Sequence, residues 1–381
     1  MQQALLGAVA AGGACVVVAV SSAVVVRPLL LWYRSDGLRD VAVGAHLRFN
    51  LRVHLHSVLL WLSGVSSKLE VLPEVAELPG DVIRVLGSNP SRMTLRGTNT
   101  YLVGRGSRRL LIDSSDGNDA YMSTLLRVCE QHGVHEITDL LLTHGHYDHM
   151  GGALRLKARF PKLRVWKYLP EQGQEGDGDG DRRLHVSNAE SQRLGISALR
   201  DGAEFRVPSE GKEDQQGAVL RAVYTPGHYN DHVCFLLEDP AKPEGPVLFS
   251  GDCILGFGSC VFDSLVDLMA SLTKLQACRA ATIYPGHGPV VSDAPSKILE
   301  YISHRQQREA EVLAALETHS KDTRGLSSAE IVAQVYEDLP FTLRVAARKA
   351  VDKHLFKLLV ERRVDLIDPA GWFESVTYRL V

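Results

Sequence analysis

Four side chains that commonly bind metal ions lie within six consecutive residues of the chain. They are His144, His146, Asp148 and His149. An apolar run, Leu140–Thr143, comes directly before them. In an extended segment, residues two apart project to the same side, so His144 and His146 can bind one ion. A catalytic zinc usually takes three protein ligands and a water, so four candidates in one loop indicate two metal ions.

Three further candidate ligands are delivered one at a time by later segments. Each follows an apolar run and a glycine: Thr225-Pro226-Gly227-His228, Phe249-Ser250-Gly251-Asp252 and Tyr284-Pro285-Gly286-His287. Six terminal ligands and one bridging carboxylate would hold two adjacent metal ions and a shared hydroxide. Because metal binding lowers the pKa of water towards about 7, this set predicts two-metal hydrolysis.

The elements that must position these ligands follow an α/β pattern. From Pro79 onward, short apolar runs alternate with helical periods. The predicted strands cover 82–86, 100–103, 110–113, 140–143, 220–224 and 247–250, and the predicted helices cover 120–131, 264–275 and 296–318. The last part of the chain predicts a small helical unit that ends in two short strands, 364–367 and 378–381. Two polar, glycine-containing stretches, 172–183 and 209–217, predict solvated surface loops.

The ligand pattern resembles the metallo-beta-lactamase superfamily, and other segments resemble the beta-lactamase-like protein 2 endoribonucleases within it. The second resemblance lies in residues 82–90 (VIRVLGSNP), 93–104 (MTLRGTNTYLVG), 224–228 (YTPGH), 249–256 (FSGDCILG), 284–289 (YPGHGP) and 301–305 (YISHR). It extends from about residue 72 nearly to the C-terminus. It implies an α/β fold in which an αββα sandwich is followed by a small winged-helix-like unit.

The resemblance also implies a role for each site residue. Two Zn²⁺ ions are expected, the first on His144, His146 and His228, the second on Asp148, His149 and His287, with Asp252 as the bridge. Asp113 is expected to support the loop and orient a ligand histidine. Asp148 is also expected to steer the attacking hydroxide.

Two departures from the family pattern affect the site. The usual Asp-Thr-Gly is Asp113-Ser114-Ser115 here, and Gly145 replaces a residue that is often Trp in relatives, which is expected to widen the cleft. His232 lies four residues after His228 and has two interpretations. It could donate a proton to a leaving group, or it could make a structural hydrogen bond.

The N-terminal part of the chain predicts a membrane anchor. Residues 4–26 carry no charge and would span roughly 34 Å as a helix, enough to cross a hydrocarbon core. Arginines after this stretch favour a cytosolic catalytic domain, and a mitochondrial location is the alternative. The predicted organisation is a membrane anchor (1–34), a linker (35–72), a hydrolase domain (73–296), a connecting helix (297–325) and a winged-helix-like domain (326–381).

The charge of the chain is nearly balanced overall but not locally. The formal net charge is −3, which indicates neither a nucleic acid nor an acidic partner, and six cysteines without regular spacing argue against a disulfide framework. Residues 344–363 contain seven basic and two acidic residues, a local charge of +5. The candidate contacts to an RNA backbone are Arg344, Arg348, Lys349, Lys353 and Lys357. The alternative is an ordinary solvated helix face.

Three functions remain open from the sequence. The first is a dinuclear zinc endoribonuclease that cleaves single-stranded RNA with a metal-activated hydroxide. The second is a thioesterase or glyoxalase II-like hydrolase of acyl thioesters, because hydroxide attack on an acyl carbon needs the same ligands. The third is a non-catalytic binding module tethered to a membrane. His/Asp sites also accept metals other than zinc. The oligomeric state stays open.

Overall fold

The computed structural model describes residues 69–170, 192–208, 217–241, 244–319, 324–336, 341–367 and 376–381. The predicted membrane anchor, almost all of the linker, and nearly all of the two polar stretches lie outside these residues. Among the described helices, none combines the length and the apolar character needed to cross a membrane.

Two sheets form the centre of the hydrolase domain. The first consists of β1 (Val75–Leu78), β2 (Val82–Leu86), β3 (Asn99–Val103), β4 (Arg108–Ile112), β5 (Glu136–Leu141), β6 (Arg164–Tyr168) and β7 (Ser197–Leu199), paired in that order. The second has the order β12-β11-β10-β9-β8. Its strands are β8 (Glu204–Arg206), β9 (Val219–Tyr224), β10 (Val233–Glu238), β11 (Val247–Gly251) and β12 (Thr282–Pro285).

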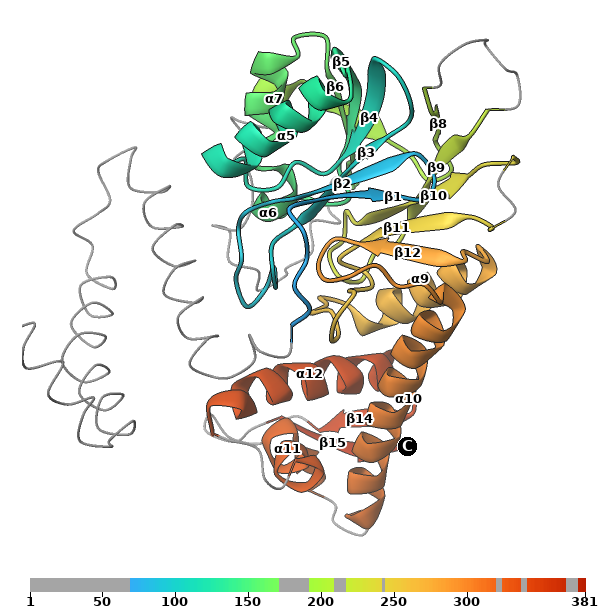
Figure 1. Cartoon of the computed structure of the whole chain (residues 1–381). Coiled ribbons are helices and arrows are strands. Elements are labelled where there is room, and N and C mark those ends of the chain that lie inside the picture. Colours follow the sequence, from blue (N-terminus) through green and yellow to red (C-terminus); the bar gives the residue numbers. More distant parts are fainter. Residues whose placement is uncertain are drawn as a thin grey trace, which may run out of the picture. The chain divides into compact units, whose positions relative to one another are not determined.

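Helices cover the outer faces of both sheets (Figure 1). On the first sheet these are α5 (Asp119–Gln131) and α7 (Ala153–Arg159), and on the second they are α9 (Leu265–Ala277) and the start of α10 (Ala294–Thr318). Between the sheets lies a third core that includes Tyr101, Phe249 and Tyr284. Because both faces of each sheet are covered, the inner strands are rich in buried apolar residues, as in β10 (VCFLLE). The predicted αββα sandwich is therefore confirmed.

A separate core holds the C-terminal unit together. Its elements are β13 (Leu326–Ser327), α11 (Ser328–Val335), α12 (Phe341–Val360), β14 (Val364–Ile367) and β15 (Thr377–Leu380), with the sheet order β13-β15-β14. The last turns of α10 contribute Val312 and Leu316 to this core. The long helix α10 thus belongs to both units, as Figure 1 shows.

Strand direction places the candidate ligands at one edge of each sheet. In the second sheet β10 is antiparallel to β9 and β11, and β12 is parallel to β11, so β9, β11 and β12 share one direction. In the first sheet β4 and β5 are parallel. Candidate ligands or their supports follow the carboxyl ends of all five strands, which is where parallel strands present loops on the same side.

One close approach of backbone fixes the loop that carries four candidate ligands. A Cβ at Gly117, where φ is +70°, would lie 2.4 Å from Cα of Gly152. Gly133 has a similar φ of +62°, yet a Cβ there would meet no atom within 4 Å. The loop after β4 can therefore pack on the start of α7 only with glycine at position 117.

Alanine substitutions at these two glycines separate backbone strain from crowding. We expect Gly133→Ala to lower the free energy of unfolding by about 1 kcal/mol, the cost of a left-handed alanine. Gly117→Ala should cost about 1–3 kcal/mol more, since the backbone must also move apart. Denaturant unfolding of both variants measures this difference, and equal losses would contradict the packing argument.

Candidate metal centre

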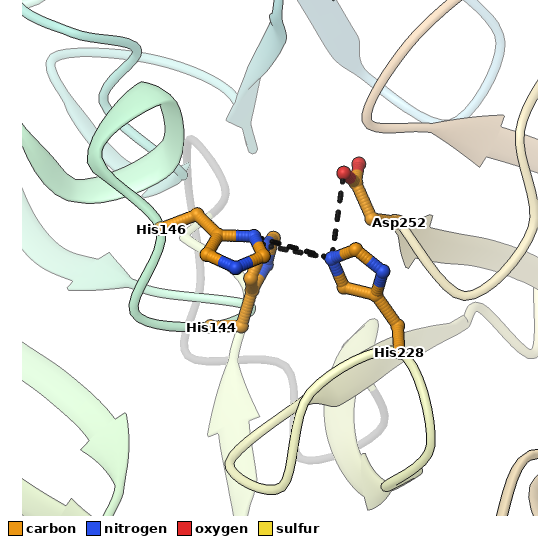
Figure 2. Close-up of side chains that lie close together, drawn as sticks. All are labelled: His144, His146, His228 and Asp252. Carbon is orange, nitrogen blue, oxygen red and sulfur yellow. Dashed lines mark hydrogen bonds and ion pairs between the residues drawn. The ribbon is translucent and has the colours of Figure 1, made fainter. Parts of the chain in front are cut away.

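The first group of candidate ligands joins the loop after β5 to the loops after β9 and β11. Nε2 of His144 lies 2.8 Å from Nδ1 of His146, and Nε2 of His228 lies 3.3 and 3.2 Å from these two atoms. Oδ2 of Asp252 lies 3.6 Å from Nε2 of His228. Figure 2 shows the three imidazoles and the carboxylate converging on one point. These four residues form the first site.

The second group lies on the other side of Asp252. The short helix α6 (Tyr147–Met150) presents Asp148 and His149, and the turn after β12 presents His287. Nε2 of His287 lies 3.3 Å from Nε2 of His149 and 3.2 Å from Oδ2 of Asp148. Oδ1 of Asp252 lies 3.4 Å from His149 and 3.2 Å from His287. Asp252 thus turns one oxygen to each group, as a bridging ligand must.

The donor set fits two metal ions. The ligand atoms within each group, His144, His146, His228 and Asp252 in one and Asp148, His149 and His287 in the other, lie within 4.8 Å of one another. Oδ1 of Asp252 is buried and accepts no hydrogen bond from the described residues. A buried carboxylate oxygen without a donor is costly unless a cation binds there. Imidazole and carboxylate suit zinc, manganese or iron, so the cluster can bind metal ions without specifying which.

Hydrogen bonds at the far ring nitrogens orient three of the candidate ligand histidines. Nδ1 of His144 lies 3.0 Å from Oγ1 of Thr143, and Nδ1 of His149 lies 2.8 Å from Oδ2 of Asp113. Nδ1 of His228 donates to the carbonyl of Val261 over 2.6 Å. Each bond places the proton on Nδ1 and leaves Nε2 free to bind a metal ion.

Asp113 has the position that the resemblance implied. It follows β4, is buried, and adopts a left-handed φ of +58°. Its carboxylate accepts hydrogen bonds from the backbone N–H of Thr143 over 2.8 Å and from the Thr143 hydroxyl over 2.9 Å, as well as from His149. Asp113 therefore connects the end of β4 to the ligand loop. It acts through His149 and Thr143, which makes it a positioning residue.

The two groups differ in protonation before metal binds. Burial, together with the neighbouring imidazoles, lowers the pKa of His144 well below its usual range, and burial lowers the pKa of His146 to about 3. Burial would also lower the pKa of His149 and His287. However, the carboxylates around them outweigh burial, raising the pKa of His149 well above its usual value and that of His287 to about 9.

His232 lies behind the first site and not beside it. Its Nε2 accepts the backbone N–H of Asp252 over 3.1 Å, and its Nδ1 lies 3.0 Å from Oγ1 of Thr225. The side chain is completely buried. Both ring nitrogens are thus occupied, so the proposed proton donation to a leaving group does not fit this geometry. The structural interpretation fits, because His232 fixes the backbone of the bridging residue.

The space beside Gly145 is filled by a polar pair. A Cβ at Gly145 would lie 3.0 Å from Oδ2 of Asp231 and 3.3 Å from Cε of Lys167. Lys167 and Asp231 form an ion pair, and Asp231 also accepts the backbone N–H of Gly145 over 3.3 Å. The pair thus lies where a side chain at position 145 would begin, and it holds the loop between His144 and His146. The expected widening of the cleft stays a prediction.

Sequence reasoning missed several groups that support the ligands. Besides Lys167 and Asp231 these are Thr143, Val261 and Thr98, whose hydroxyl donates to Oδ2 of Asp148 over 3.3 Å. Thr143 could have been found, because it directly precedes the ligand loop. The others come from distant segments and carry no local signal.

The predicted RNA contacts on α12 divide into two sets. Arg344, Arg348 and Lys349 are exposed, and Arg348 donates to Oγ of Ser328. Lys357 pairs with Glu309 and Glu361, both at 2.7 Å, and Lys353 donates to the carbonyl of Phe262. Lys353 and Lys357 are thus engaged within the chain, so they do not form the free cationic surface that the charge count indicated.

Comparison with known proteins agrees with this fold and site. The metallo-beta-lactamase superfamily profile matches residues 93–287, and the beta-lactamase associated winged helix domain matches residues 327–372. The chain belongs to the metallo-beta-lactamase superfamily and carries the winged helix domain associated with it. It is therefore a member of a superfamily of metal-dependent hydrolases.

Relatives align over most of their length. The chain is 38% identical over 315 residues to lactamase-like protein adaB of Aspergillus niger, covering 80% of this chain and 88% of the relative. It is 38% identical over 300 residues to the beta-lactamase-like protein 2 homolog of Drosophila melanogaster, covering 78% and 94%. It is 35% identical over 291 residues to the atrochrysone carboxyl ACP thioesterase of Aspergillus fumigatus, covering 74% and 81%.

A solved structure shares the fold. A beta-lactamase domain protein from Burkholderia ambifaria superposes with a TM-score of 0.62 at 20% identity, covering 83% of this chain and 98% of that one. At this identity the likeness concerns the fold alone.

The protonation difference predicts how pH affects metal binding. At pH 7 the first-site histidines are neutral, whereas His149 and His287 hold protons that a metal ion must displace. The apparent affinity of the second site should therefore rise with pH up to about 9, by about tenfold per pH unit for each proton displaced. The affinity of the first site should change little between pH 6.5 and 8. Titrations of Co²⁺ into metal-free protein at several pH values measure both, and equal pH slopes would contradict the assignment.

Changing Asp113 tests the orientation of His149. Asp113→Asn keeps the size of the side chain but weakens the bond to Nδ1, so we expect the affinity of the second site to fall by about 10–100-fold. Asp139→Asn is the matched control, because Asp139 is also a buried carboxylate but pairs with Arg164 and Trp166, away from the ligands. If both variants bind metal alike, Asp113 does not orient the ligand.

Proposed function

We propose that the chain is a dinuclear metal-dependent hydrolase that cleaves phosphodiester bonds in single-stranded RNA. The observation that supports hydrolase activity is the pair of three-residue ligand groups with Asp252 between them. His144, His146 and His228 would hold one ion, and Asp148, His149 and His287 the other. Such ions supply a hydroxide nucleophile at neutral pH and stabilise the charge that develops on the substrate.

The residues of the chain prepare the site for this reaction. Neighbouring His149 and His287 hold the pKa of Asp148 and Asp252 well below the usual range although burial opposes this, so both stay ionised at neutral pH. Asp148 is partly exposed, with its Oδ2 held by Thr98. We assign to Asp148 the orientation of the attacking water, since among the carboxylates of the cluster its side chain is the most exposed.

RNA is the preferred substrate because of the basic C-terminal unit. Relatives of similar identity are named both beta-lactamase-like protein 2 and thioesterase, so the likeness alone does not choose between the substrates. Arg344, Arg348 and Lys349 are exposed on α12 and can contact phosphates.

An acyl thioester is the second candidate. Relatives of similar identity are named atrochrysone carboxyl ACP thioesterase and thioesterase pkgB. Val261, whose carbonyl holds His228, has an exposed apolar side chain, as does Phe257 in the same loop. Exposed apolar side chains of this kind suit an acyl chain better than a phosphate. A non-catalytic binding module is disfavoured, because all seven candidate ligands converge and hydrogen bonds orient His144, His149 and His228.

A direct comparison of substrates tests the proposal. We expect metal-loaded full-length protein to cleave single-stranded RNA, and both EDTA and His146→Ala to reduce cleavage to the background of the metal-free protein, because each removes a metal ion or its ligand. Acyl-CoA and glutathione thioesters are assayed beside RNA with the same preparations.

Arg344→Met and Lys349→Met should weaken RNA cleavage in a salt-dependent manner without affecting a thioester. If the metal-loaded protein leaves RNA intact but hydrolyses a thioester, the thioester is the substrate and the RNA proposal is rejected. No turnover of either would reject both.

A further inference from the structure

An irregular loop connects the end of β11 to α9 and supports one ligand of the first site. We call residues Leu255–Asp263 the support loop. The carbonyl of Val261 accepts the Nδ1–H of His228 over 2.6 Å, and the backbone N–H of Asp263 donates to the carbonyl of Gly227 over 2.7 Å. The loop thus contacts both the imidazole and the turn that presents it.

The support loop contains no helix or strand, so its backbone groups need partners from elsewhere. Gly256 donates its N–H to the carbonyl of His287 over 2.8 Å, which fixes the start of the loop. The carbonyls of Gly258, Cys260 and Phe262 are contacted by side chains of helices α10 and α12, which follow the hydrolase sheets in sequence.

Helix α10 holds the first half of the support loop. The Tyr301 hydroxyl accepts the N–H of Leu255 over 2.9 Å and donates to the carbonyl of Gly258 over 3.2 Å. The Arg305 guanidinium is mostly buried and donates to the carbonyl of Cys260 over 3.2 Å and to Oγ of Ser259. Two side chains one helical turn apart thus provide hydrogen-bond partners for consecutive parts of the loop.

Helix α12 of the C-terminal unit holds the second half. The Lys353 ammonium donates to the carbonyl of Phe262, the residue directly after Val261. It also lies 5.2 Å from the centre of the Phe262 ring and 3.9 Å from Oδ1 of Asp263. Arg305 packs over the same ring at 4.6 Å. Phe262 is therefore held between cations from α10 and α12.

These contacts form a continuous connection from the C-terminal unit to the first site. It passes from Lys353 to Phe262, along the backbone to Val261, and through one hydrogen bond to His228. Partners that orient a ligand are known to change metal affinity by about 10–100-fold when removed. The core of α12, which includes Val351 and Leu355, packs against the end of α10 and fixes the position of Lys353.

We propose that Lys353 and Arg305 are positioning residues, through which the C-terminal unit sets the orientation of His228 and hence the affinity of the first site. This rests on the metal centre of the proposed function but not on its substrate. It gives the basic helix α12 a role inside the chain. Anything that displaces the C-terminal unit, including a bound substrate, would then act on the first metal ion.

Co²⁺ titration of the metal-free full-length protein, with a competing chelator, tests this proposal. His228→Ala identifies the phase that belongs to the first site. We expect Lys353→Met to weaken that phase about tenfold and to leave the second-site phase nearly unchanged. The support loop contacts His287 through Gly256 at the start of the loop, whereas Lys353 holds Phe262 near its end. Lys353→Arg, which restores the cation, should recover most of the affinity.

Lys357→Met is the matched control. Lys357 lies one turn further along α12 and is more buried than Lys353, but it pairs with Glu309 and Glu361 and not with the support loop. It should lower the stability of the C-terminal unit without changing either phase. The proposal is overturned if Lys353→Met titrates like the wild type, if Lys357→Met weakens the first site equally, or if both sites weaken together.

The outcome is separable from that of the substrate proposal, because no substrate is present in this titration. If Lys353→Met loses affinity for Co²⁺ at the first site, and the metal-loaded wild type leaves RNA intact in the separate cleavage assay, the positioning role is upheld and the nuclease is rejected. Wild-type protein that binds no Co²⁺ at either site would reject the metal centre itself.

Discussion

The burial of seven imidazoles and carboxylates in one small volume is the constraint on which the rest of the structure depends. Taking these groups out of water is unfavourable, and each must be oriented by a partner that is itself held in place. Asp113 shows how far this extends, since it accepts three hydrogen bonds while its backbone adopts a left-handed φ of +58°. The two sheets supply rigid strand ends from which every ligand and most supports project.

The sequence predicts most of the hydrolase fold because the decisive signals are local. Strand β2 is predicted to the residue, and α5, α9 and α10 are predicted within two residues at each end, since their apolar periods lie between clear turn residues. The strands that were not predicted include β7 and β8, which are three residues long, and β10, which directly follows the ligand turn that ends at His232. The three-residue strands owe their structure to pairing across the sheet, which no local pattern reveals. Strand β10 does have a local signal, the apolar run VCFLLE, which the sequence interpretation did not use.

The same distinction applies to the site. All seven candidate ligands follow strand ends within a few residues and were found from the sequence, whereas their supports come from far away. Val261 lies 33 residues from His228, Lys167 lies 64 from Asp231, and Lys353 lies 91 from Phe262. Counting charges on α12 could not show that Lys357 pairs with Glu309, because the partner is on another helix.

The supports differ in chemistry from the ligands, and this difference bears on specificity. A ligand set of histidines and aspartates suits phosphodiester and thioester hydrolysis equally, since both need a hydroxide and charge stabilisation. The surroundings supply other chemistry: the Lys167–Asp231 pair occupies the space beside Gly145, and the exposed Val261 side chain lies on the loop that holds His228. Val261 orients His228 through its backbone carbonyl, which any residue supplies, so its exposed side chain can change without removing that hydrogen bond. The side chains of the support loop can therefore vary while the orientation of the ligand is kept.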